Sequence, residues 1–494
     1  MPFNSYPYIA FLIFAVGAFL LLEAYFPRAR RPYLLLLSYL FYAWWRTDFI
    51  LLLVGSTIVN YTIGSEITRR HAKGWSTHVL LLAGLAFNLG LISLFKYDDL
   101  FVGTANALFG TGFALPHFFL PLAISFFTFE QISYLVDASQ GKTRLYSFLD
   151  YALFVAFFPH LIAGPIVRYN DLIPQFHESR DTQTRDTDIA AGATLFTIGL
   201  AKKTLIADNL APFADAIFGS AQHGVALGPG DAWLGTLFFA FQIYFDFSAY
   251  TDMALGSACM FGIRLPFNFN SPYKAASIIE FWRRWHISLS TFLRDYLYIS
   301  LGGNRQGSVR RYVNLMITML LGGLWHGANW TFMLWGGLHG TYLVINHAWR
   351  NVAGRFGWRP PENLAWASHA ASVLITFAAT TFAWVVFRSP DLASAGNVMR
   401  GLVGGGSSHL VSFSPLAAGA LVVLFAVVWF APNSMEILWA YRPALEPPRG
   451  TSQVRDIGRW RWQPSRRGAI AYGALCVGAM LALSNLSPFI YFQF

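Results

Sequence analysis

The sequence predicts an all-α protein whose helices cross a membrane many times. Of its 494 residues, 55% are hydrophobic and only 12% are charged, whereas a soluble domain usually carries about 25% charged residues. Apolar runs recur along the whole chain, and they are too long and too uniformly apolar for barrel strands. We therefore expect one integral membrane domain over residues 1–494, with roughly ten to twelve spans of about 20 residues each.

The first apolar run, residues 6–25, is expected to be a retained span. Its basic residues, Arg28, Arg30 and Arg31, follow the run and do not precede it, which is the opposite of a secretory signal and places the N-terminus outside. The other strong candidates are 78–95, 118–136 and 365–387. Shorter or interrupted runs are 33–45, 49–64, 148–167, 191–206, 232–250, 312–325, 328–346, 416–431 and 469–484.

Basic residues gather in short loops between the apolar runs. These loops are residues 28–31, 69–73, 283–311 and 442–467, and the positive-inside rule puts all four in the cytoplasm. The net charge of +10 is thereby explained by topology and anionic lipid heads, and we expect no nucleic-acid partner.

Polar residues interrupt the apolar runs in the middle of the chain, and this predicts a functional core over residues 120–350. Lys202 and Lys203 lie in one such run, and polar residues with many glycines lie in 312–347. Polar groups survive at membrane depth when protein buries them or when they line a cavity.

Two segments of this core interrupt helices or bury acids. His160 lies between Pro159 and Pro165, which predicts a kinked turn that either is structural or lines a cavity. Asp246 and Asp252 end a strongly apolar run. A carboxylate there needs a partner, so Asp246 is either in a structural ion pair or cap, or holds a catalytic side chain in place.

Residues 280–290 are predicted to form an amphipathic helix near the interface. Glu280 would then face Arg283 and Arg284, and His286 would point into the protein. Arg294 and Arg305 follow. This basic cluster suits lipid phosphates, or the phosphates of coenzyme A.

Residues 320–330 place His326 between glycines and tryptophans in an apolar run. An imidazole can move a proton near neutral pH, and glycines let a substrate approach the backbone. The residues alone leave open whether His326 is catalytic or a satisfied core histidine. No histidine spacing matches a zinc motif, and Cys259 and Cys476 suggest neither a metal site nor a disulfide.

The chain resembles the membrane-bound O-acyltransferase family, and within it the bacterial branch that acetylates alginate and cellulose. The resemblance rests on residues 121–129, 158–165, 244–252, 281–290, 294–305 and 324–330, of which the Trp325-His326-Gly327 and Trp282–His286 segments are the most specific. It implies a helical core with a tunnel.

The resemblance also implies roles for individual residues. His326 matches the family's catalytic histidine and would act as general base, and His286 matches the second signature position, meeting His326 across the tunnel. Trp285 and Trp325 would wall the tunnel, and Arg283, Arg294 and Arg305 would hold coenzyme A. We also assign Asp246 and Asn329 to substrate binding.

The expected activity is O-acetyl transfer from cytoplasmic acetyl-CoA to an extracellular alginate- or cellulose-like polysaccharide. A periplasmic SGNH-type acyltransferase would accept the acetyl group, and a polysaccharide synthase or secretion complex and membrane lipid are further expected partners. We expect a multi-pass protein of the bacterial inner membrane with no bound cofactor. The alternatives are a non-enzymatic transporter of acyl groups or lipid-linked sugars, which often has internal repeats that are missing here, and a scaffold subunit of a synthase.

Overall fold

A computed structural model describes residues 1–162, 164–178, 180–357, 360–407, 410, 415–448, 450–485 and 489–490. Throughout these ranges the chain forms helices joined by loops, without a strand, so the predicted all-α class is confirmed. The proposed cytoplasmic loop 442–467 lies inside them apart from Arg449.

The predicted apolar runs correspond to helices. Those of the N-terminal half are α1 (Tyr6–Tyr25), α2 (Arg30–Ala43), α3 (Asp48–Ala72), α4 (His78–Ile92), α5 (Asp98–Phe109), α6 (Ile124–Ser139), α7 (Phe148–Ala156), α8 (Phe158–Leu161), α9 (Tyr169–Leu172), α10 (Thr182–Ala201) and α11 (Asp208–Gln222). Those of the C-terminal half are α12 (Pro229–Met260), α13 (Ile278–Trp282), α14 (Ile287–Phe292), α15 (Gly307–His326), α16 (Trp330–Arg355), α17 (Ala365–Arg388), α18 (Leu392–Leu402), α19 (Pro415–Phe430), α20 (Ser434–Leu438) and α21 (Arg466–Leu481).

Among the described residues, five helical segments are long and apolar enough to cross a membrane, or six if the bent pair at 417–441 is one span. The range of ten to twelve spans stays a prediction. α12 is not among these segments. Its side chains are buried by other helices along most of its length and can be polar where lipid does not reach them.

Two expected elements differ from the structure. The run 118–136 becomes helical only at Ile124, because Pro121 precedes it and Ala123 has a positive φ of 65°. The expected helix over 280–290 is wrong: α13 ends at Trp282, and α14 starts after His286, whose φ is 41°. Glu280 nevertheless pairs with Arg284 at 2.7 Å, as expected from their spacing, while Arg283 is exposed.

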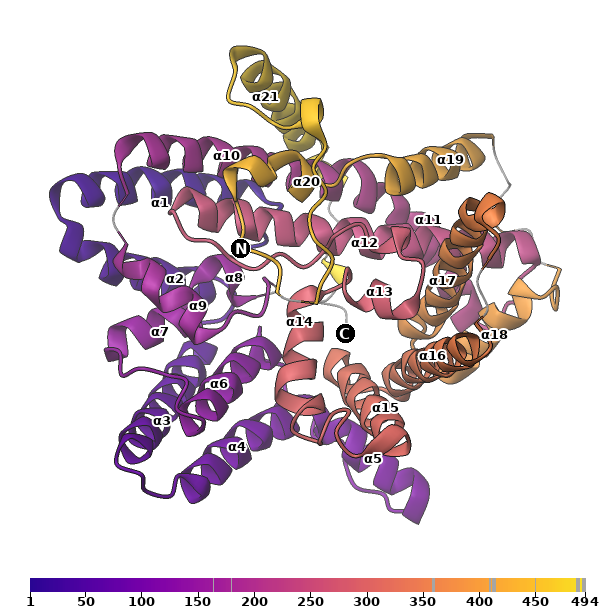
Figure 1. The fold of residues 1–494 in the computed structure, drawn as a ribbon, viewed down its shortest axis with the longest axis horizontal. Coiled ribbons are helices and arrows are strands. Elements are labelled where there is room, and N and C mark those ends of the chain that lie inside the picture. Colours follow the sequence, from indigo (N-terminus) through magenta and orange to yellow (C-terminus); the bar gives the residue numbers. More distant parts are fainter. Residues whose placement is uncertain are drawn as a thin grey trace.

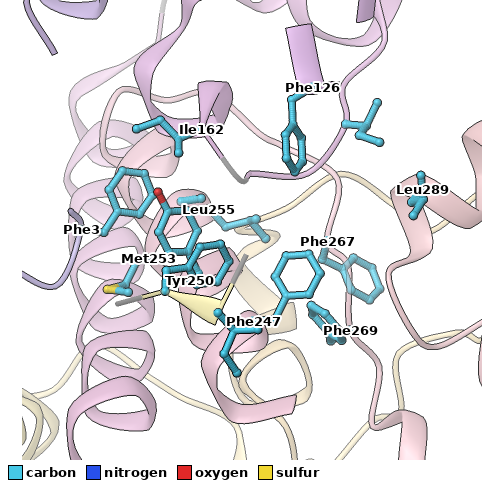
Figure 2. Packing of buried hydrophobic residues seen from close by; sticks show 14 of the residues in the cluster. Phe3, Phe126, Ile162, Phe247, Tyr250, Met253, Leu255, Phe267, Phe269 and Leu289 are labelled. Atoms are coloured by element: carbon cyan, nitrogen blue, oxygen red, sulfur yellow. The ribbon is translucent and has the colours of Figure 1, made fainter. Parts of the chain in front are cut away.

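The core forms around α12, against which α10 packs along much of its length (Figure 1). Gly192 and Gly256 make this approach possible, because a Cβ on either would meet the backbone of the other helix. In the turns of α12 before Gly256, Tyr250 stacks on Phe3 with ring centroids 4.5 Å apart, and Met253 lies beside them (Figure 2). In Figure 1, α3, α4 and α6 form a group at the lower left, α15 and α16 lie at the lower right, and α17 lies above α16 on the right.

Candidate active site

His326 lies at the bend between two antiparallel helices. It is the last residue of α15, and Gly327 then leaves the helix in an extended conformation. Its side chain is buried, with 4% exposure, and its ring packs edge-on against Trp335 and Phe387, at 5.0 and 5.3 Å between centroids. Aromatic walls on two sides leave the imidazole few orientations.

His286 reaches the same place from a different part of the chain. Its left-handed backbone joins α13 to α14, and the N–H of Ile287 donates to the carbonyl of Asn268 at 3.0 Å, which ties this joint to the preceding loop. The His286 ring is fully buried and packs edge-on against Phe247. The ring centroids of His286 and His326 are 6.5 Å apart, so two imidazoles that are far apart in sequence face a common region.

Two cavities lie near the histidines, and one of them is lined by His326 itself. His326 lines a cavity of about 250 Å³ together with Lys96 and Ser125. Its remaining lining residues are Trp45, Phe119, Leu120, Pro121, Leu122, Ala123, Ile124, Phe126, Ile162 and Trp325. A second, more polar cavity of about 450 Å³ is lined by Ile287 and Ser288, the two residues after His286.

The two cavities lie toward opposite ends of α2. Trp45, on the first cavity, follows the C-terminal end of this helix. At the N-terminal end, the guanidinium of Arg30 donates to the carbonyls of Phe176 and Glu178, at 2.9 and 2.8 Å, in the segment directly after Asp171, which lines the second cavity. The second cavity therefore lies on the side of the basic loop 28–31, which we expect in the cytoplasm, and the first lies on the opposite side.

The tryptophans that were expected to wall a tunnel have different surroundings. Trp325 lines the first cavity, and its ring centroid is 5.9 Å from that of His286. Trp285 is buried in an aromatic cluster, packed between Phe281 and Trp384 at 5.6 and 4.9 Å. Trp325 therefore contacts both histidines, whereas Trp285 contacts the aromatic cluster and not the cavity.

The polar residues that were expected to bind substrate lie in different parts of the structure. Arg294 lines the second cavity and donates to Asp295 at 2.6 Å, whereas Arg283 and Arg305 are exposed away from the lining of either cavity. Asn329 caps α16 by accepting from the N–H of Thr331, and it donates to the carbonyl of Pro390 at 2.7 Å.

Asp246 takes part in a buried ion cluster. One of its oxygens lies 2.6 Å from Nζ of Lys203, which is also 2.7 Å from Asp208, and the other accepts from the N–H of Ile490 at 2.9 Å. This is the ion-pair alternative left open by the sequence. In the described part of the chain, no group of three or more His, Cys, Asp or Glu side chains is arranged to hold a metal ion.

Sequence reasoning missed two further polar groups. Lys96 ends an apolar run and lines the cavity beside His326, and its position at membrane depth was the available signal. Glu130 lies 3.2 Å from Nδ1 of His160, whose other ring nitrogen contacts the carbonyl of Phe154 at 3.0 Å. His160 is therefore held by the protein at the break between α7 and α9, which favours the structural interpretation of that kink.

Known proteins resemble this chain in sequence. The profile of the membrane-bound O-acyltransferase family matches residues 123–387. A peptidoglycan O-acetyltransferase of Helicobacter pylori is 43% identical over 81% of this chain and 80% of its own length. The probable alginate O-acetylase AlgI of Pseudomonas aeruginosa is 40% identical over 94% of this chain and 95% of its own, and a teichoic acid D-alanyltransferase of Streptococcus thermophilus is 27% identical over 54% and 68%.

Proposed function

The chain belongs to the membrane-bound O-acyltransferase family, and from that premise we propose that it transfers acetyl groups across the bacterial inner membrane. Acetyl-CoA in the cytoplasm is the proposed donor, and an extracellular glycan is the final acceptor. Relatives named for alginate and for peptidoglycan acetylation support a glycan as acceptor class. Membership of an enzyme family favours catalysis over the transporter and scaffold alternatives.

The observation that carries the proposal is the placement of His326 on one cavity, 6.5 Å between ring centroids from His286, whose next two residues line another. The second cavity has Arg294 and Arg168 on its wall beside Asp171, Asp295 and Glu446, and both arginines pair with Asp295. We assign the phosphates of coenzyme A to these two guanidinium groups, since guanidinium groups bind phosphate well. The opposite cavity brings the acceptor hydroxyl to His326. The two cavities share no lining residue, so the proposed reaction requires them to join between the histidines when the substrates bind.

In the proposed reaction, His326 removes the proton from the acceptor hydroxyl as general base. The hydroxyl oxygen attacks the thioester carbonyl carbon and forms the new C–O bond. His286 stabilises the negative charge that develops on the carbonyl oxygen. The C–S bond then breaks, and the sulfur of coenzyme A leaves with the proton that His326 received.

The lining of the cavity beside His326 indicates which kind of acceptor receives the acetyl group. They are mostly apolar, including Leu120, Leu122 and Phe126, and the volume of about 250 Å³ is small. A sugar polymer needs many hydrogen-bonding partners, whereas one hydroxyl on a protein side chain needs few. This supports transfer to the hydroxyl nucleophile of a periplasmic SGNH-type acyltransferase, which then modifies the polymer beside its synthase or secretion complex.

The decisive experiment measures transfer of radiolabelled acetyl from acetyl-CoA to an added SGNH-type acyltransferase by the purified protein in lipid vesicles. His326→Ala should abolish transfer, while the control variant His78→Ala should retain it, because His78 is exposed and lines neither cavity. Both variants are first compared by size-exclusion profile. Normal transfer by a folded His326→Ala protein would refute the proposal.

A further inference from the structure

Lys96 occupies an unusual position for a lysine. It lies in a π-helical segment, Ser93–Tyr97, between α4 and α5, both of which are largely apolar. A π-helical turn widens a helix locally and is frequent at functional sites. A lysine at this depth requires partners that offset its removal from water.

Those partners are at the end of the helix that carries His326. Nζ of Lys96 donates to the carbonyl oxygen of Trp325 at 2.5 Å and to that of His326 at 3.3 Å, and it donates to Oγ of Ser125 at 3.3 Å. The next residue, Tyr97, donates from its hydroxyl to the carbonyl of Leu324 at 2.9 Å. Two consecutive side chains thus bind the last three carbonyls of α15.

These carbonyls need external donors. The last four C=O groups of an α-helix have no partner within the helix, and together they carry partial negative charge that favours a cation. Without such donors a helix end frays. At the end of α15 this fraying would move His326 directly, because Gly327 leaves the helix immediately after it.

We propose that Lys96 is a positioning residue that fixes the C-terminal end of α15 and thereby the imidazole of His326. This inference rests on the proposed function of His326. A lysine has three N–H donors, and the three oxygens above account for all of them. Although Lys96 lines the cavity, its hydrogen bonds are therefore directed at the protein.

The test compares Lys96→Met, which keeps the length of the side chain and removes its donors, with Lys96→Arg, which keeps donors and charge. Lys96→Met should lower kcat about 100-fold, since a misplacement of about 1 Å can have this effect, while KM for acetyl-CoA stays unchanged. Lys96→Arg should recover at least a tenth of the wild-type kcat. Tyr97→Phe, which removes one hydrogen bond farther from the imidazole, should lower kcat less than tenfold.

A second measurement does not depend on activity. Hydrogen exchange of the backbone amides of residues 323–326, in the last turn of α15, should become faster in Lys96→Met and stay slow in Lys96→Arg. Unchanged kcat with unchanged exchange in Lys96→Met would overturn the inference, and so would a raised KM at constant kcat, which indicates substrate binding. If His326→Ala stays active, the proposed function itself fails, and this result is separate from the exchange experiment.

Discussion

The close packing of α15 against α16 leads to a sharp prediction about Gly336. A Cβ at this position would lie 3.0 Å from the carbonyl carbon of Met319 and 3.2 Å from Cα of Leu320, and closer still to the carbonyl oxygen of Met319. All three atoms belong to the backbone of α15 and cannot rotate away. Gly336→Ala therefore has to move the two helices apart.

The magnitude follows from contact distances. Restoring ordinary van der Waals contact requires the helices to separate by about 1 Å. His326 ends α15 and packs against Trp335, the residue before Gly336, so the imidazole moves with the helix. A displacement of this size should lower kcat about 100-fold and destabilise the protein by about 1–3 kcal/mol.

Gly337→Ala is the matched control. Its Cβ would lie 3.6 Å from Cδ2 of Leu320, an ordinary contact with a flexible side chain. Both substitutions gain the same helix propensity, about 0.5–1 kcal/mol, so their difference isolates the clash. Acetyl transfer and thermal unfolding in the same detergent are measured for both. Equal kcat in the two variants would refute the view that this helix contact positions His326.

The remaining predictions concern charge and chemistry. His326→Gln, which keeps much of the side-chain volume, should lower kcat by about 10²–10⁴-fold through loss of the general base, measured at saturating acetyl-CoA; a smaller loss than tenfold contradicts a proton-transfer role. Asp246→Asn weakens a buried ion cluster around Lys203. It should destabilise the protein by up to about 3–5 kcal/mol in denaturant unfolding and leave the KM for acetyl-CoA unchanged. A raised KM without destabilisation would instead favour a role of Asp246 in substrate binding. Arg294→Ala should raise KM for acetyl-CoA about tenfold at constant kcat, whereas Arg28→Ala, at an exposed residue outside the lining of the cavity, should not. Equal effects of the two substitutions would point to general charge.

Several features followed from local sequence patterns. Pro159 and Pro165 predicted the break after α7, and the spacing of Glu280 and Arg284 predicted their ion pair. The bend at His286 was missed, because a left-handed backbone at a histidine leaves no reliable trace in the sequence. The three arginines assigned to coenzyme A could not be ranked, since only the fold shows that Arg294 reaches a cavity and Arg283 does not.

The sequence by itself determined that this is an all-helical membrane protein with polar residues inside its apolar runs, and which family motifs it carries, because composition and the length of apolar runs act without reference to the rest of the chain. The tertiary structure decided which distant residues meet: His286 with His326, Lys96 with the end of α15, and Asp246 with Lys203. Helices surrounded by lipid and by one another are apolar on most faces, so periodicity does not identify the packing face. Shape, small residues and buried hydrogen bonds select it, and these act only once the helices are side by side.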